Sequence, residues 1–251
     1  MRNHGLLITG TDTGVGKTFV ACGLAGALRR QGLSVAPFKP AETGCAFDTE
    51  SQRLIPADAE LLRRATGTAA PLDTICPYRF APPVAPWVAA EQAGKTIDPQ
   101  HIERCYRELT ASHDIVLVET AGGILVPLAE QFHYADLAGL LRLPVLIVIG
   151  SKLGAINHTR LTLEFLHTAG LPVLAGVLNH PCKETDPATA TNEQTLRRLT
   201  RVPLHVIPNQ TIGQSTGGQS AGTPPWDDPA FDALASHVTH CLDPLQSQRR
   251  T

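Results

Sequence analysis

The sequence predicts an α/β fold in which helices cover both faces of a mostly parallel central sheet. Short runs rich in Val, Ile and Leu alternate along the chain with longer amphipathic segments. The short runs are continuously apolar, which is typical of strands buried on both faces. Strands that alternate with helices in this way form a parallel sheet. The predicted strands are 6–9, 35–38, 115–118, 145–149, 173–178 and 205–207, and the predicted helices are 17–31, 57–65, 99–112 and 157–169.

Two glycines mark the expected ends of helices. Gly32 and Gly170 stand just past the helices predicted over 17–31 and 157–169. Glycine often ends a helix because it adopts the left-handed conformation without strain. We therefore expect both helices to stop at these positions.

Two stretches interrupt the alternation of strands and helices. Residues 68–87 contain five prolines, which predicts an ordered loop over one edge of the sheet. Residues 209–229 are rich in Gln, Gly, Ser, Thr and Pro, which predicts a mobile loop before a last helix near 231–242. The end of the chain, 245–251, is expected to be frayed. The whole chain, 1–251, is predicted to form a single domain.

The composition excludes several classes of protein. Of the 251 residues, 43% are hydrophobic and 18% are charged, which is a globular composition. The formal net charge is −2 and the arginines are scattered, so we expect no nucleic-acid partner. The apolar stretches are shorter than the roughly 18 residues that span a bilayer, so we expect no membrane partner. The opening residues read as a strand rather than a leader, and the six cysteines form no CxxC pair, which favours a cytoplasmic protein with reduced thiols.

The segment LLITGTDTGVGKT combines a buried strand, a glycine-rich turn and the start of a helix. This context predicts a phosphate-binding loop, or P-loop, from Gly10 to Thr18. Gly14 and Gly16 allow backbone N–H groups to face an anion, and the helix N-terminus adds partial positive charge. Lys17 can reach the outer phosphates, and the Thr18 hydroxyl can ligate Mg²⁺. The alternative is a glycine-rich turn with an exposed lysine.

The spacing of this loop departs from the common pattern of Gly, four residues and then Gly-Lys-Thr. The position six residues before Lys17 is Thr11, and Gly10 lies one residue too early. The P-loop is therefore a variant, and a P-loop alone does not define a reaction.

A second lysine lies where ligands of a parallel sheet bind. Lys39 follows the strand predicted over 35–38, and Thr43 comes after it in a predicted turn. Ligands of an open parallel sheet bind at the carboxyl ends of its strands. Lys39 would therefore add positive charge beside a triphosphate, although a lone lysine at a strand end is usually a surface residue.

Two acids are candidates for holding a metal ion. Glu119 ends the strand predicted over 115–118, where P-loop enzymes place an acid that holds the metal or its water. The alternative is an acid that caps a helix. Gly122 follows, where a glycine allows close approach of the backbone. Asp58 lies at a predicted helix start, where most aspartates are simple caps, so it carries no functional weight alone.

The motifs GTDTGVGKT, KPAETG, ETAGG followed by LVPL, SKLGAINHT and GVLN occur in this order from about residue 9 to 208. Together they resemble the dethiobiotin synthetase family of the biotin pathway. The P-loop is shared with many relatives, but the KPxxTG and LGxINH elements are not. The resemblance implies a ligase that consumes ATP with Mg²⁺, joining CO₂ or bicarbonate to 7,8-diaminononanoate and closing the ring of dethiobiotin.

The resemblance also implies roles for particular residues. Lys39 and Lys17 would be catalytic, and Thr18, Asp58 and Glu119 would hold Mg²⁺. The expected nucleotide-binding residues are Thr13, Gly14, Val15, Gly16, Lys17, Thr18, Asp58, Glu119, Gly122, Asn179 and Pro208. The expected substrate-binding residues are Thr13, Thr43, Gly154 and Asn157.

The last two residues on each list have more specific expected roles. By resemblance, Asn179 reads the adenine and Pro208 lies beside the base. Gly154 and Asn157 would bind the carboxylate tail of the substrate across the interface of a homodimer. A helix start, where they lie, suits an anion.

Some positions depart from the pattern of the family. Thr120 stands where the family commonly has Gly, and Trp87 stands where His is common. Residues 181–200 and 209–230 match poorly. None of these departures removes a group that the expected reaction requires.

Three other functions are weighed against this one. A cobyrinate-type amidotransferase would need an added glutaminase domain, for which the chain is too short. A partitioning or positioning ATPase would carry a second lysine near the position of Asp12. The remaining alternative is an α/β nucleotide-binding domain without an assigned reaction.

Overall fold

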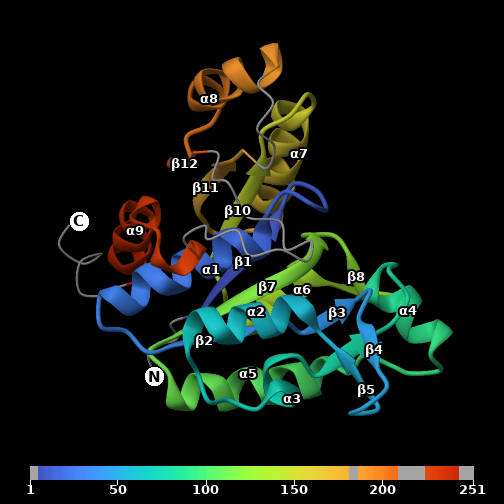
Figure 1. Cartoon of the computed structure of the whole chain (residues 1–251). Helices are drawn as coiled ribbons and strands as arrows, with labels where there is room; N and C mark the ends of the chain where they lie inside the picture. Colours follow the sequence, from blue (N-terminus) through green and yellow to red (C-terminus); the bar gives the residue numbers. More distant parts are fainter. Residues whose placement is uncertain (1–4, 181–185, 209–223, 243–251) are drawn as a thin grey trace.

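The computed structural model describes residues 5–180, 186–208 and 224–242. Its centre is a six-stranded sheet with the order β12-β11-β10-β1-β7-β2, in which every neighbouring pair is parallel (Figure 1). The strands are β1 (Gly5–Gly10), β2 (Val35–Phe38), β7 (Ile115–Gly123), β10 (Val145–Gly150), β11 (Val173–Asn179) and β12 (Leu204–Ile207). The predicted α/β fold with a parallel sheet is confirmed.

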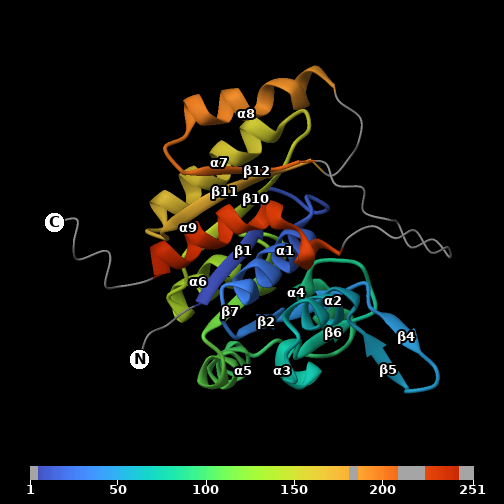
Figure 2. The same cartoon turned by 60° about the vertical axis from the view of Figure 1, so that its left-hand side comes forward.

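Both faces of the sheet are buried by helices (Figures 1 and 2). Leu6 and Ile8 of β1 join a core with residues of α1, α2 and α9, whereas Leu7 joins a core with residues of α5, α6, α7 and α8. This division follows from the period of two along a strand. The helices are α1 (Lys17–Arg30), α2 (Ala57–Thr66), α5 (Pro99–Ser112), α6 (Tyr134–Leu141), α7 (Ala155–Thr168), α8 (Pro187–Leu199) and α9 (Asp232–Leu242).

The helix ends expected at two glycines are present. Gly32 and Gly170 have φ angles of 85° and 67° just past α1 and α7. The helices α6 and α8 lie outside the predicted set. Each begins with a capping box, made by His133 with Asp136 and by Asp186 with Thr189. Histidine and threonine are unusual in these positions, which hides the start signal.

The proline-rich segment 68–87 contains more regular structure than the predicted loop. It contains α3 (Leu72–Ile75) and β6 (Tyr78–Phe80), and α4 (Pro86–Gln92) begins in it. The strand β6 pairs in parallel with β3 (Ala41–Thr43). Proline is tolerated at a helix start because its missing N–H would have no partner there. The prediction of a loop is therefore wrong for these elements.

The segment 209–229 is described only from residue 224. There η1 (Pro225–Asp227) and η2 (Pro229–Phe231) pack on α1, so the predicted mobile loop is wrong for this part. Arg30 donates to the carbonyl oxygens of Trp226 at 2.6 Å and Asp228 at 3.0 Å. At Gly26 a Cβ would lie 1.9 Å from the Trp226 oxygen, so only glycine permits this approach. Residues 209–223 and 245–251 lie outside the described residues.

The smaller elements form two hairpins beside the main sheet. These are β4 (Ala46–Asp48) with β5 (Arg53–Ile55), and β8 (Pro127–Ala129) with β9 (Phe132–His133). Within the described ranges, no helix combines the length and the apolarity needed to cross a membrane. Five cysteines are described and all are free thiols, namely Cys22, Cys45, Cys76, Cys105 and Cys241.

Candidate active site

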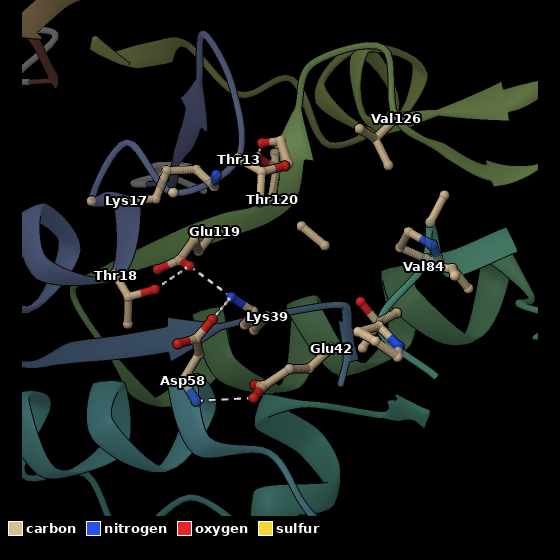
Figure 3. A pocket seen from close by; sticks show the side chains of 18 of the residues that line it. Thr13, Lys17, Thr18, Lys39, Glu42, Asp58, Val84, Glu119, Thr120 and Val126 are labelled. Atoms are coloured by element: carbon tan, nitrogen blue, oxygen red, sulfur yellow. Dashed lines mark hydrogen bonds and ion pairs between the residues drawn. The ribbon is translucent and has the colours of Figure 1, made fainter. Parts of the chain in front are cut away.

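A cavity of about 580 Å³ opens at the carboxyl ends of β1, β2 and β7. This is a volume suited to a small-molecule ligand, at the edge of the sheet where ligands bind. Figure 3 shows that P-loop side chains converge on it with Lys39, which follows β2, Glu119 of β7 and Asp58 of α2. The predicted site residues that line it are Thr13, Gly14, Gly16, Lys17, Thr18, Lys39, Thr43, Asp58, Glu119 and Gly122. The structure thus brings these residues together, while their roles remain predictions.

The P-loop is shaped by a left-handed residue at the start of α1. Gly16 is the N-cap of this helix, with a φ angle of 90°. A Cβ at Gly16 would lie 2.2 Å from Nδ2 of Asn179, so both backbone and space require glycine here. Lys17 is buried, and its ammonium donates to the carbonyl oxygen of Asp12 at 3.3 Å. Burial lowers the pKa of Lys17 from its ordinary value.

Lys39 lies between two carboxylates at the centre of the cavity (Figure 3). Its Nζ is 2.5 Å from Oδ2 of Asp58 and 2.7 Å from Oε1 of Glu119. Burial pushes the pKa of Lys39 down, but Glu119 and Asp58 outweigh it and hold this pKa above its usual range. Lys39 is therefore held in its charged form by two carboxylate partners.

The same carboxylates form a donor set that fits Mg²⁺. The Thr18 hydroxyl donates to Oε1 of Glu119 at 2.8 Å, so the residues predicted to hold the metal lie side by side. The other oxygen, Oε2 of Glu119, is buried and has no hydrogen-bond partner among the described residues. A buried carboxylate oxygen without a partner is costly, and a cation would relieve that cost. Oxygen ligands of this kind are those that Mg²⁺ prefers.

Asp58 does not cap its helix, although sequence position alone favoured that role. The N-cap of α2 is Pro56, whose side chain cannot accept a hydrogen bond. The amides of Asp58 and Ala59 instead donate to the carboxylate of Glu42 at 2.9 and 3.0 Å. Glu42, which lies in β3, therefore caps α2 in place of Asp58. The Asp58 carboxylate is then available to pair with Lys39. Glu42 was not predicted from the sequence, where its only signal was an acid within KPAETG.

An apolar wall on one side of the cavity was also missed. It consists of the segment from Pro83 to Pro86, with Val84 half-exposed at its centre, and of Val126 near the start of β8. Thr43 lies on the same side. The proline-rich run was the only signal, and a loop assignment gives no information on which surface the loop lines.

The two departures from the family pattern leave the cavity intact. Thr120 is fully buried; its hydroxyl donates to the carbonyl oxygen of Gly122 at 2.7 Å and lies 3.3 Å from Thr9 Oγ1. Thr120 therefore lines the cavity beside the P-loop, with its hydroxyl bonded to the backbone at the end of the sheet. Trp87 lies outside the lining.

Five predicted site residues lie outside this cavity lining: Val15, Gly154, Asn157, Asn179 and Pro208. Asn179 is buried at the end of β11, and its Nδ2 donates to the Val15 carbonyl oxygen at 2.9 Å, so it is bonded to the P-loop itself. Pro208 follows β12 and is exposed. Gly154 is the N-cap of α7, with a φ angle of 92°, and Asn157 is exposed in its first turn. Within the described residues, Gly154 and Asn157 do not share the cavity that Lys39 lines.

The parallel sheet, the P-loop and the lysine and acids at its carboxyl edge define a nucleotide-binding protein of the P-loop class. Solved structures agree with this fold. MinD of Pyrococcus horikoshii OT3, solved in complex with Mg-ADP, covers 98% of this chain and 99% of its own with a TM-score of 0.52 and 18% identity. A putative plasmid partition protein from Borrelia burgdorferi B31, bound to AMPPNP, covers 96% and 98% with a TM-score of 0.53 and 11% identity. At such low identity these two share the fold alone.

Sequence relatives narrow the class to one family. The AAA domain family matches residues 4–211. The ATP-dependent dethiobiotin synthetase BioD of Anaeromyxobacter dehalogenans (strain 2CP-C) is 47% identical over 206 residues, which are 82% of this chain and 90% of that protein. The protein of the same name from Aquifex aeolicus (strain VF5) is 40% identical over 203 residues, 81% and 88% of the two chains. The chain belongs to the ATP-dependent dethiobiotin synthetase family, as its motifs predict.

Proposed function

We propose that this chain catalyses ATP-dependent closure of the dethiobiotin ring from 7,8-diaminononanoate and CO₂, releasing ADP and phosphate, in biotin biosynthesis. Membership of the dethiobiotin synthetase family supports the reaction. The observation that carries the proposal is Lys39, buried between Asp58 and Glu119 on the same cavity as Lys17. Two lysines and two acids around one small cavity suit a phosphoryl transfer to a small molecule.

The reaction needs no protein nucleophile. One amine of the substrate attacks CO₂ and forms a carbamate. A carbamate oxygen then attacks the γ-phosphorus of ATP, and ADP leaves. The second amine attacks the carbonyl carbon of the mixed anhydride, phosphate leaves with the bonding electrons, and the ring closes. Catalysis of such steps consists mainly of positioning and charge neutralisation.

Each side of the cavity has its own part in this scheme. The backbone N–H groups at Gly14 and Gly16 bind the phosphates, and Lys17 and Lys39 neutralise the transferring group. Thr18, Asp58 and Glu119 would hold Mg²⁺, which would supply further charge neutralisation for the phosphates.

The substrate side is more apolar than the phosphate side. Thr13 and Thr43 line the cavity, and their hydroxyls would hydrogen-bond the carbamate. The wall formed by Val84 and Val126 suits the alkyl chain of the diamine.

The base and the carboxylate tail occupy places outside the cavity. In this proposal Asn179 and Pro208 contact the base, and the N-terminus of α7 at Gly154 and Asn157 binds the tail. Leu153 and Leu161 are 83% and 62% exposed beside that helix start. Their exposure supports the predicted homodimer, in which a second copy would bury them. The single domain over 1–251 and the cytoplasmic location stay predictions of the sequence.

A product assay tests the proposed reaction. The purified protein is incubated with diaminononanoate, ¹³C-labelled bicarbonate, Mg²⁺ and ATP, and the products are analysed by mass spectrometry. We expect dethiobiotin that carries one heavy carbon, with one ADP formed per dethiobiotin. A reaction without the diamine is the control. ATP binding without any dethiobiotin would reject the proposed function.

A further inference from the structure

Glu42 lies inside the KPAETG segment but has no part in the scheme above. It is in β3, with 5% of its surface exposed, between Lys39 and Thr43 along the chain. Its Oε1 accepts the Asp58 amide at 2.9 Å, and its Oε2 accepts the Ala59 amide at 3.0 Å. Figure 3 shows the Glu42 side chain reaching the backbone below the Asp58 carboxylate.

A carboxylate in this position satisfies two needs of α2. The first amides of a helix have no partner within the helix, and the helix dipole favours negative charge beside them. Burial raises the pKa of Glu42, while Lys39 and the two amides oppose that rise. Because Glu42 belongs to another element, its two hydrogen bonds fix the first turn of α2 relative to β3 and hence to the cavity.

We propose that Glu42 is a positioning residue for this reaction, which fixes the Asp58 carboxylate through the first turn of α2. The proposal rests on the proposed function. The contacts run from Glu42 to the Asp58 amide, and from Oδ2 of Asp58 to Nζ of Lys39 at 2.5 Å. Glu42 thereby sets both the partner of Lys39 and one oxygen ligand of the metal.

The rest of α2 is held by other means. Leu62 and Ala65 are buried in the core shared with α1. Loss of the Glu42 contact should therefore leave the helix on the sheet and release only its first turn. This separates a positioning role from a general contribution to folding.

The first test is Glu42→Gln, which keeps the shape but replaces one acceptor oxygen by a donor. We expect kcat to fall about 10-fold and the half-saturating Mg²⁺ concentration to rise about 10-fold, as for loss of one hydrogen bond to a charged group. The KM for diamine and the KM for ATP at saturating Mg²⁺ should stay within about twofold, because the Glu42 oxygens are occupied by amides. Calorimetric titration of Mg²⁺ into the protein with ADP gives the metal affinity without turnover.

A matched control comes from another helix cap. Oδ1 of Asp98 accepts the Gln100 amide at 2.9 Å at the start of α5, outside the cavity lining. Asp98→Asn should lower the melting temperature as Glu42→Gln does, with an unchanged dependence on Mg²⁺. Equal Mg²⁺ dependence of the two variants would reduce Glu42 to an ordinary cap and overturn the proposal.

A double-mutant cycle tests whether Glu42 acts through Asp58. In the Asp58→Asn background, Glu42→Gln should change the Mg²⁺ affinity by less than about twofold. Additive effects would overturn the proposal, and so would a raised KM for diamine with normal Mg²⁺ dependence, which would indicate direct substrate contact. If Glu42→Gln fails to fold, Glu42→Asp keeps the charge but withdraws the oxygens, and the same result is expected.

The assays distinguish failure of the two proposals. A wild-type protein that makes no dethiobiotin rejects the proposed function, and the titration of Mg²⁺ with ADP still tests the role of Glu42. An active wild type with an equally active Glu42→Gln variant rejects the role of Glu42 alone.

Discussion

The cavity above the P-loop and the start of α7 are both predicted to hold the substrate, but they differ in how far one chain completes them. In the cavity, Lys39 and Glu119 are buried and bonded to each other. At the start of α7, Asn157 is exposed and Leu153 has most of its surface in solvent. If α7 binds the carboxylate tail as proposed, the reacting half of the site is built within one chain, whereas the half for the tail would need another surface to enclose it.

The largest expected effect lies in the buried half. Lys39→Gln should lower kcat by about 10²- to 10³-fold, because it removes a fixed charge from the transferring phosphoryl group. The affinity for ADP should stay within about threefold, since the P-loop is unchanged. Turnover is measured by product formation and ADP affinity by calorimetry. Lys95→Gln, an exposed lysine outside this cavity, is the control, and an unchanged kcat for Lys39→Gln would remove Lys39 from the mechanism.

A smaller effect of a different kind is expected at α7. Asn157→Ala should raise the KM for diamine about 10-fold with little change in kcat, because a hydrogen bond to the distant carboxylate is lost equally in ground and transition states. Thr162→Ala, on the same helix, loses a hydrogen bond to the His158 carbonyl oxygen and serves as the control. If the tail site spans two chains, dilution of the wild type to monomers should raise the same KM. A fall in kcat without a change in KM would contradict this role.

Two buried asparagines allow the halves to be tested against each other. Nδ2 of Asn179 donates to Val15 in the P-loop, and Nδ2 of Asn192 donates to the carbonyl oxygen of Lys152, just before α7. Asn179→Ala should raise the KM for ATP about fivefold, and Asn192→Ala should raise the KM for diamine by a similar factor, as for the loss of one neutral hydrogen bond. Steady-state kinetics with each substrate varied in turn measures both. The same KM change in both variants would show that the halves are not separate.

The smallest effect is expected where the two regions touch. Nζ of Lys152 is 2.8 Å from Oδ2 of Asp12 in the P-loop, and this pair lowers the pKa of Asp12. Both side chains are partly exposed, so Lys152→Ala should lower the free energy of unfolding by less than about 1 kcal/mol, and by less still at high salt. Thermal unfolding at low and high salt measures the loss. Arg197→Ala, which breaks the exposed pair with Glu193, is the control; a large loss of ATP affinity for Lys152→Ala alone would make the pair a functional link.

The sequence predicted the elements and the edge of the sheet better than the contacts between them. The strand 35–38 has the predicted bounds because a short apolar run that ends before a lysine leaves little choice in where the strand begins and ends. That alone places Lys39 at the carboxyl edge. Its contact with Asp58 depends on where α2 packs, and no local pattern reports this. The same holds for Glu42, whose amide partners lie 16 and 17 residues further along the chain.

The two loops that were wrongly predicted, within 68–87 and 209–229, have a common physical origin. Prolines at 71 and 86 look like breaks in a pattern, yet one caps α3 and the other is the first residue of α4. The ordering of 224–229 comes from Arg30, which is about 200 positions away in the chain. Composition describes what a segment can do alone, whereas tertiary partners decide these two cases.

The position of Lys39 also bears on how the protein selects its metal. Lys39 is a built-in counterion, because its ammonium contacts both acids and offsets one of their two negative charges. A free divalent ion, whether magnesium or calcium, must compete with this covalently attached cation. A bound triphosphate would offer the ammonium a new partner and so release the carboxylates for the metal. We therefore expect the metal to bind together with the nucleotide. The nucleotide-free protein should bind divalent ions more weakly than two acids without a lysine between them would.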